Sequence, residues 1–426
     1  MSPEESASMT PAYAVPDAPA TAGHLYLQTN EVRNAVIHYA RRTDGTLDEL
    51  ERTLTGGAGS GVFKPISGQA SAPNAFEGAA SVIISPDRGL LFATNGGDNS
   101  VSSFGIGSDG RLQLLDVRRT GNLVDGPSGT AKSLAYAPGC RTLYVLHSFG
   151  PDHLRAMTVE DDGSLTPRPE RHTVDTAEKQ GRIPTTVVLS PDGRFLVVGT
   201  TFDQLPTANP DGSPILWVDG PDGVPKLIAS NAPDPDGLAV FAVHQDGTLD
   251  GPSFEDAGCG SPFYPAFLHD RPDHLVIGAA VGDGVVLARI DAAGHITTGP
   301  LVRIDTSAGA PSELCWLAVS PDDTFVFATN FGYSTISTFK IEGNVVSVVQ
   351  DPASRKVPGD GTFRALNGTV SSGPSDNWLS PEGTHLYQIY GNASKLVGYA
   401  VRPDGSLDEM TSAPIPYNSP QGLAGF

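Results

Sequence analysis

The stretch SVIISPDRGLLFATNGGDNSVSSFGIGSDGRLQLLDV, residues 81–117, decides the fold of this chain. Four short runs rich in β-forming residues alternate in it with tight turns that carry Gly, Asp, Asn and Pro. This alternation is typical of a four-stranded antiparallel meander, in which each strand pairs with the next through a short hairpin. The same strand–turn–strand pattern recurs at residues 134–148, 187–201, 266–280, 317–330 and 377–391.

A second marker recurs where the third strand of each unit is expected to end. It is a glycine that follows an acidic residue in all units but one: Asp44-Gly45, Asp109-Gly110, Asp162-Gly163, Asp246-Gly247, Ala293-Gly294, Glu342-Gly343 and Asp404-Gly405. Seven such units, without helical periodicity between them, predict an all-β fold, a seven-bladed β-propeller of four-stranded antiparallel blades. A β-sandwich is the alternative, but it gives no reason for one hairpin to repeat.

The two ends of the chain suggest how the ring closes. The first unit begins with HLYLQTN at 24–30 and lacks an innermost strand upstream, whereas the chain ends in a lone GLAGF at 422–426. We expect this C-terminal strand to complete the first blade and to close the ring, so that no sheet edge stays open there. Residues 1–22, rich in Pro, Ala and Ser, are predicted to be a flexible arm, and 23–426 a single domain.

Composition and charge exclude several classes of partner. The chain has 27 Lys plus Arg against 48 Asp plus Glu, a formal net charge of −21, and no basic cluster. Nucleic acids and anionic membranes both demand a positive face, so neither is an expected partner. The N-terminus has no secretory signal, no apolar run reaches the ~20 residues of a membrane helix, and the three cysteines form no disulfide framework. We therefore expect a soluble cytoplasmic protein.

The lengths of the loops predict where a ligand binds. In such a meander the first-to-second and third-to-fourth turns share one face of the ring, and here they are tight. The other face receives the long, irregular segments: 57–80, 119–131, 173–184, 257–265, 305–314, 353–375 and an insertion at 203–237 between the second and third strands of the fourth blade. Loops of that last length are usually functional or disordered. A ligand site is therefore predicted at the mouth of the central channel on this face.

Aligning the units on their turns places candidate side chains at that mouth. Seven are predicted to bind substrate: Lys132, Arg182, Tyr264, Trp316, Asn95, Asn330 and Tyr390. Lys132 and Arg182 would hold a carboxylate, so the expected partner is a small anionic organic acid or lactone between aromatic walls. The predicted catalytic residues are His147, Glu77 and Asp376, with His147 as general base because its ordinary pKa lies near neutral.

Each of these residues also has a structural interpretation. His147 stands where other units carry Asn, a side chain that commonly ties a turn. Glu77 would cap a loop, Asp376 would bind neighbouring backbone amides, and Trp316 would belong to the core between blades. No metal or nucleotide motif is present and no cofactor is expected. A Ca²⁺ or Mg²⁺ ion held by Glu77, Asp376 and the mouth asparagines is the alternative, because these ions take oxygen ligands.

The repeated S-P-D-G hairpins, the D-G-x-L turns and the seven blades in one domain resemble the lactonase-type seven-bladed β-propellers over roughly residues 24–426. That family includes 6-phosphogluconolactonases and carboxymuconate-cyclising enzymes. GCGSPFYPAF at 258–267 and LCWLAVSPDD at 314–323 resemble a divergent bacterial branch of it. The resemblance implies a metal-free mouth that handles lactones or unsaturated acids by acid–base chemistry, as a hydrolase or as a cyclase/isomerase.

The chain departs from this family at the residues that usually carry the chemistry. Thr185-Thr186 stand where family members carry a His, Trp316 stands where they carry an acidic residue, and Phe331 stands where they carry an Arg. The usual catalytic set is therefore not carried over residue by residue. A non-catalytic propeller that binds a small molecule or a protein through the same rim is the alternative function.

Overall fold

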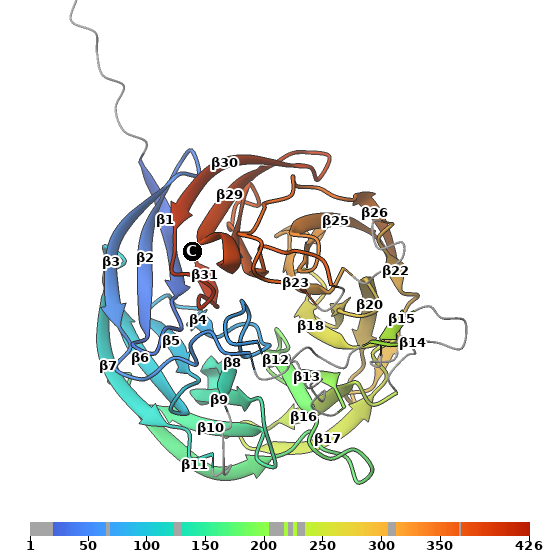
Figure 1. Cartoon of the computed structure of the whole chain (residues 1–426). Helices are drawn as coiled ribbons and strands as arrows, with labels where there is room; N and C mark the ends of the chain where they lie inside the picture. The colour runs from blue at the N-terminus through green and yellow to red at the C-terminus, as the bar shows by residue number, and fades with distance from the viewer. Residues whose placement is uncertain are drawn as a thin grey trace, which may run out of the picture.

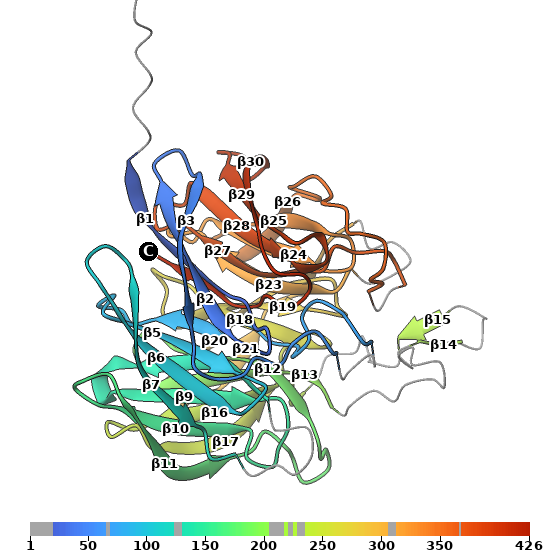
Figure 2. The same ribbon diagram turned by 60° about the vertical axis from the view of Figure 1, so that its left-hand side comes forward.

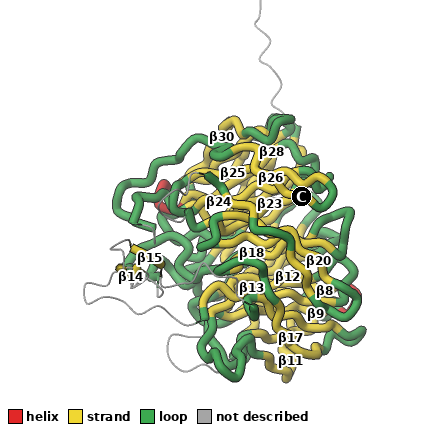
Figure 3. Tube along the Cα trace, turned by 90° about the vertical axis from the view of Figure 1, so that its right-hand side faces the viewer, coloured by secondary structure: helices red, strands yellow, loops and turns green. Residues whose placement is uncertain are grey.

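The computed structural model describes residues 20–64, 69–122, 130–203, 235–305, 312–365 and 368–426, and the backbone of two short strands at 217–219 and 225–227. Apart from those two short strands, which pair with each other, the described strands form seven sheets arranged as a ring (Figure 1). Helical structure in these residues is limited to two short 3-10 turns, η1 (Pro138–Cys140) and η2 (Gly391–Ala393) (Figure 3). None of the helical segments described has the length and apolar character needed to span a membrane. The predicted all-β seven-bladed propeller is confirmed.

Blades 2 and 3 show the regular plan, in which strands run outward from the channel in chain order. Blade 2 contains β4 (Val82–Ile84), β5 (Leu90–Asn95), β6 (Ser100–Ile106) and β7 (Leu112–Arg119). Blade 3 contains β8 (Ala131–Ala137), β9 (Thr142–His147), β10 (Leu154–Val159) and β11 (Leu165–His172). Neighbouring strands within both blades are antiparallel.

Blades 4 and 5 depart from this plan by additions. Blade 4 contains β12 (Ile183–Leu189), β13 (Phe195–Phe202), β16 (Leu238–Val243) and β17 (Leu249–Glu255). The predicted insertion lies between β13 and β16; most of it falls outside the described residues, apart from the paired strands β14 (Trp217–Asp219) and β15 (Pro225–Leu227). Blade 5 contains β18 (Pro262–Phe267), β19 (His274–Ala279) and β20 (Gly284–Ile290), and β20 pairs with both β21 (Ile296–Thr298) and β22 (Val302–Arg303).

Blades 6 and 7 return to four strands, and blade 1 closes the ring. Blade 6 contains β23 (Leu314–Val319), β24 (Phe325–Asn330), β25 (Thr335–Glu342) and β26 (Val345–Gln350), and blade 7 contains β27 (Pro374–Leu379), β28 (His385–Tyr390), β29 (Lys395–Val401) and β30 (Leu407–Pro414). Blade 1 combines β1 (Thr21–Gln28), β2 (Ala35–Arg42) and β3 (Leu47–Leu54) with the C-terminal β31 (Leu423–Gly425).

The pairing of β31 with β1 confirms the predicted closure. The two strands are antiparallel, with Leu25 opposite Gly425 and Leu27 opposite Leu423. The C-terminus consequently lies beside β1 in both ribbon views (Figures 1 and 2). Residues 1–19 of the predicted arm lie outside the described residues, and β1 begins at Thr21.

The apolar core is divided among the spaces between adjacent blades. Between blades 3 and 4, for example, Tyr144 and Leu146 of β9 belong to one buried cluster with Leu196 and Val198 of β13. Each sheet therefore buries both faces against its neighbours, and removal of this apolar surface from water is the main contribution to stability.

The predicted glycine markers lie between the third and fourth strands, where they join neighbouring blades. The Asp carboxylate accepts a hydrogen bond from the amide two residues on, as Asp109 does from Arg111 N at 3.1 Å. The glycine that follows has a positive φ, +78° at Gly110. Its carbonyl accepts a hydrogen bond from the preceding blade, in the pairs Tyr26–Gly110, Ser103–Gly163, Tyr144–Gly247, Thr338–Gly405 and Tyr387–Gly45.

Substitution of Gly110 tests whether this close approach is essential. A Cβ atom there would lie 2.4 Å from Nδ1 of His24, whereas Gly193 has a similar φ of +73° and nothing within 4 Å of its Cβ position. We expect Gly193→Ala to lower the free energy of unfolding by the ~1–2 kcal/mol of a left-handed residue. Gly110→Ala should lower it by at least twice as much. Urea unfolding measures both, and equal losses would mean that backbone conformation alone matters.

Candidate functional site

The innermost strands of five blades bulge where they begin. Pairing with the second strand shifts register there, and the residues at the shift are Lys132, Thr185, Phe263, Cys315 with Trp316, and Ser375 with Asp376. Bulges re-aim side chains and are common beside active sites. Contacts link neighbours around the channel, because Lys132 Nζ donates to Pro184 O at 2.7 Å and Thr185 Oγ1 to Phe263 O at 2.8 Å. We call these residues the bulge ring.

The connection between blades 1 and 2 packs against the bulge ring. Residues 69–80, which we call the cover segment, bond to blade 3 through Leu134 N to Ala80 O (3.0 Å) and to blade 4 through Ala79 N to Thr185 O (3.3 Å). Asn418, between β30 and β31, donates from Nδ2 to Ser71 Oγ at 2.9 Å. Ala72 and Ala79 also belong to a buried cluster with Phe263 and Trp316 of blades 5 and 6. The cover segment therefore spans the end of the channel at which the site was predicted.

Two opposite charges are buried where this connection meets the ring. Lys64 Nζ forms an ion pair with Glu77, and the side chains are only 3% and 12% exposed. Lys64 Nζ also donates to Asn74 O at 3.3 Å and lies 5.1 Å from the centre of the Phe331 ring. Lys64 was not among the predicted site residues. A signal was present, because Lys64 and Glu77 are the only charged residues between 57 and 80.

Lys132 is fully buried and bound to carbonyl oxygens. Its Nζ donates to Glu77 O at 2.9 Å as well as to Pro184 O. Burial disfavours the ammonium form and lowers the pKa of Lys132 to about 7, an effect that the charge of Glu77 opposes. Two of the three N–H donors of Lys132 therefore bind backbone carbonyl groups and are not available to the predicted substrate carboxylate.

Asp376 combines deep burial with an oxygen that has no partner. Burial raises the pKa of its carboxyl to about 7, although the amides of Ala80, Leu423 and Asn377 partly offset the rise. Asn377 N lies 3.1 Å from Oδ1, whereas Oδ2 finds no hydrogen-bond partner in the described part of the chain. Both burial and the charge of Asp376 raise the pKa of Tyr264, a partly exposed residue of β18, so the two groups are electrostatic neighbours.

A buried aromatic cluster lies beside these groups. Trp316 is fully buried and packs edge-to-face on Phe263, with ring centres 4.8 Å apart, and also contacts Phe331. Its indole Nε1 has no hydrogen-bond partner among the described residues. The adjacent Cys315 is buried, and desolvation raises the pKa of its thiol, so it stays protonated and is a poor nucleophile.

The geometry of His147 argues against its predicted role as general base. The side chain is fully buried, Nδ1 lies 3.1 Å from His153 O, and Nε2 lies 2.8 Å from Thr120 Oγ1. Burial lowers the pKa of His147 to about 3, so the ring is neutral at pH 7. Because both ring nitrogens are engaged, none is available to a substrate, and the structural interpretation fits this residue.

Asn95, Asn330 and Tyr390 also differ from the predicted substrate contacts. Each bonds to the third strand of its own blade. Asn95 Nδ2 donates to Ser100 and Ser102 at 3.0 and 2.8 Å, and Asn330 Nδ2 donates to Thr335 and Ser337 at 3.1 and 2.7 Å. Tyr390 lies in the core, with its hydroxyl 2.7 Å from that of Tyr399. The Asn and its Ser or Thr partners have the same spacing in the sequence of both blades. This repeated pattern could have indicated the structural role of the Asn.

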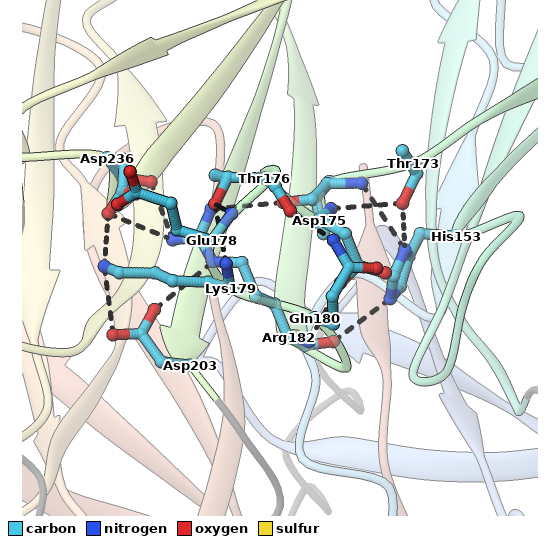
Figure 4. A network of polar contacts seen from close by, with 11 residues as sticks. His153, Thr173, Asp175, Thr176, Glu178, Lys179, Gln180, Arg182, Asp203 and Asp236 are labelled. Carbon is cyan, nitrogen blue, oxygen red and sulfur yellow. Dashed lines mark hydrogen bonds and ion pairs between the residues drawn. The ribbon is translucent and has the colours of Figure 1, made fainter.

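Arg182 ties the base of the insertion instead of facing a substrate anion (Figure 4). Its buried guanidinium donates through Nε to Asp203 Oδ1 at 3.2 Å and through Nη2 to Asp236 O at 2.7 Å. Lys179 also pairs with both carboxylates. Asp203 and Asp236 are described residues at the two ends of the 203–237 insertion, so one buried arginine holds these ends together.

The arrangement of possible ligands gives little support to the alternative of a bound Ca²⁺ or Mg²⁺ ion. Within the described ranges, no three His, Cys, Asp or Glu side chains are grouped as metal ligands would be. The Glu77 carboxylate already binds Lys64 and, at 3.0 Å, Asn74 Nδ2. The expectation that the protein needs no cofactor stays a prediction.

A cavity of about 610 Å³ lies elsewhere, between the tight turns of blades 3 and 4. It is lined at the turn ends of β8 and β12, opposite to the bulge ring, by Cys140, Leu189, Arg194 and His244 among others. Arg194 pairs with Asp192, and His244 Nε2 lies 2.8 Å from Asp250 Oδ2, so these two polar side chains of the cavity already have partners. The bulge ring is therefore the stronger candidate for chemistry.

The buried ion pair makes a direct prediction about stability. Glu77→Gln leaves Lys64 as an uncompensated buried charge, which typically costs ~3–5 kcal/mol of unfolding free energy. The double variant Lys64→Met/Glu77→Gln removes both charges and should recover most of that loss. Chemical denaturation of the two variants and the wild type measures this, and a double variant no more stable than Glu77→Gln would contradict the pairing.

Comparison with known proteins supports the lactonase resemblance. No family model matches the chain. A curated 6-phosphogluconolactonase of Erwinia tasmaniensis is 21% identical over 340 residues, which cover 78% of this chain and 83% of that protein. The low identity fits a divergent branch.

Solved structures share the fold. The periplasmic gluconolactonase of Pseudomonas aeruginosa superposes with a TM-score of 0.63 at 17% identity, covering 95% of this chain and 98% of that one. A protein from Lactobacillus plantarum gives a TM-score of 0.64 at 15% identity, covering 95% and 99%. At these identities the likeness establishes the fold.

Proposed function

We propose that the protein hydrolyses a small lactone at the bulge ring, with Asp376 as general base. The observation that carries the proposal is a buried carboxyl group whose pKa is raised to about 7 and whose Oδ2 has no hydrogen-bond partner among the residues that the structure describes. A general base acts best when its pKa lies near the working pH. Similarity to a 6-phosphogluconolactonase and to a gluconolactonase supports the reaction class.

The proposed reaction uses Asp376 twice. As a water oxygen attacks the lactone carbonyl carbon, Oδ2 of the carboxylate accepts the proton that the water loses. The tetrahedral intermediate then collapses, the ring C–O bond breaks, and the departing oxygen takes the proton back from Asp376. The product is a hydroxy acid and the carboxylate is regenerated. Tyr264, whose raised pKa keeps its phenol protonated, donates a hydrogen bond to the substrate.

Glu77 and Lys132 are assigned positioning roles in this proposal. Lys132 binds across the contact between the cover segment and the bulge ring, through the bond from its Nζ to Glu77 O. The Glu77 carboxylate ties the cover segment to Lys64, earlier in the same connection between blades 1 and 2. By holding the cover segment in place they keep the ring dry, which strengthens the electrostatic interactions of Asp376 with a bound substrate.

Two other functions are compatible with the same site. Cyclisation or isomerisation of a small unsaturated acid would use the same carboxyl group to move a proton to or from carbon, and it stays a prediction, as do binding without catalysis and a cytoplasmic location. A perturbed carboxyl beside a phenol in the bulge ring favours chemistry over binding alone.

Substitution of the proposed base is the first test. Asp376→Asn keeps the shape of the side chain but cannot accept the water proton, so kcat should fall by at least ~10²-fold. His147→Asn, which installs the residue found at this position in blades 2 and 6, is the control and should stay within about threefold of wild type, far below a general base's contribution. Proton release from a panel of γ- and δ-lactones measures both. Full activity of Asp376→Asn would eliminate Asp376 as the base.

The pH profile is a second, independent test. Because the raised pKa keeps Asp376 protonated below about pH 7, kcat/KM should rise roughly tenfold per pH unit up to about pH 7 and then level off. The measurement is initial rates between pH 5 and 9 after subtraction of spontaneous hydrolysis. A profile that is flat over this whole range, as a pKa near the usual ~4 of a carboxyl would give, would indicate an ordinary, exposed carboxylate instead.

A further inference from the structure

We propose that the bulge ring accepts an uncharged lactone with an apolar or aromatic body and discriminates against phosphorylated lactones. This inference rests on the proposed function and names the substrate class of the same site. It follows from three features of the described residues. The nearby cations already have partners in the protein, Asp376 is negatively charged when it acts as a base, and the aromatic cluster carries an indole N–H.

The cations nearest to the ring are already neutralised or bound by the protein. Lys64 pairs with Glu77, and Lys132 donates to Glu77 O and Pro184 O. Arg182 is held by Asp203 and the carbonyl of Asp236. A phosphate group is normally recognised by several charged N–H donors at once. To supply them, this site would have to break the Lys64–Glu77 pair and leave the buried Glu77 carboxylate without its cation.

The charge at the centre of the site also opposes an anion. Asp376 must be ionised to act as a base, and its buried carboxylate then faces the substrate in surroundings that screen charge poorly. The formal net charge of the chain, −21, adds a long-range field of the same sign. Both effects raise the free energy of a phosphorylated substrate and leave a neutral one unaffected.

The buried aromatic cluster next to the bulge ring suits an apolar ring that carries one carbonyl group. Phe263, Phe331, Phe363 and Trp316 form a single buried cluster, and Tyr264 packs against it. The indole Nε1 of Trp316 is a donor without an acceptor among the described residues, although its side chain is fully buried. An indole N–H can only donate, so its matching group is a neutral acceptor such as the lactone carbonyl oxygen.

Three substrates test the inference on the wild-type protein: a sugar δ-lactone, its 6-phosphorylated form, and dihydrocoumarin as an aromatic δ-lactone. We expect kcat/KM for both uncharged lactones to exceed that for the phosphorylated one by at least about tenfold. An equal or higher value for the phosphorylated lactone overturns this inference and leaves the proposed hydrolysis intact. Hydrolysis of none of the three overturns the proposed function and the inference with it.

A pair of tryptophan variants tests the indole N–H. Trp316→Phe keeps an aromatic ring but removes the donor, so KM for dihydrocoumarin should rise by about tenfold or more. Trp378→Phe is the matched control: Trp378 follows Asp376 on β27 by two residues, stacks on Tyr387 at 6.0 Å, and should keep the wild-type KM. Melting temperatures identify any loss of folding. A folded Trp316→Phe protein with unchanged KM would exclude Trp316 from substrate binding.

Discussion

The contact on which the ring depends is the one between a glycine turn and the preceding blade. The glycine carbonyl accepts a hydrogen bond from its neighbour, and the absence of a Cβ atom lets that neighbour approach, as His24 does at Gly110. A buried carbonyl needs a partner wherever water is excluded, and this arrangement supplies one without widening the gap between sheets. The bond from Tyr387 to Gly45 repeats it between blades 7 and 1, so the device that spaces neighbouring blades also helps to close the ring with β31.

This contact explains why the fold could be predicted from the residues alone. Turns that need a positive φ select Gly, and the preceding Asp caps the same turn, so the chemistry that joins the blades is local and visible at fixed spacing. Asn95 and His147 show the limit. Strand periodicity places them at the end of a second strand, but only contacts with other segments decide whether a side chain faces the channel. Asn95 instead bonds to the third strand of its own blade, and His147 to Thr120, which follows β7.

Sequence alignment of the repeated units could predict only those site residues that lie at a repeated position. Alignment of the units found Lys132 and Asp376, because the bulges recur at one place in the repeat. It missed Lys64, which lies in a connection that repeats nowhere and approaches Phe331, 267 positions further along the chain. Arg182 stood at a plausible position, but its partners Asp203 and Asp236 flank an insertion whose ends meet only in the folded ring. Contacts between distant segments decide these side chains, and no local pattern encodes them.

Two ionisable groups in the bulge ring distinguish it from an ordinary inter-blade contact. Burial is the largest cause that moves the pKa of Asp376 up and the pKa of Lys132 down, both to about 7, against the opposing effects of neighbouring amides and of Glu77. Blades 2, 3 and 4 carry Ser81, Ser133 and Thr186 where blade 7 carries Asp376, and hydroxyl groups satisfy the same surroundings without a charge. A buried carboxyl that ionises near neutral pH is costly to the fold. The fold can do without it at the equivalent position of three other blades, so its presence in blade 7 is better explained by chemistry than by stability.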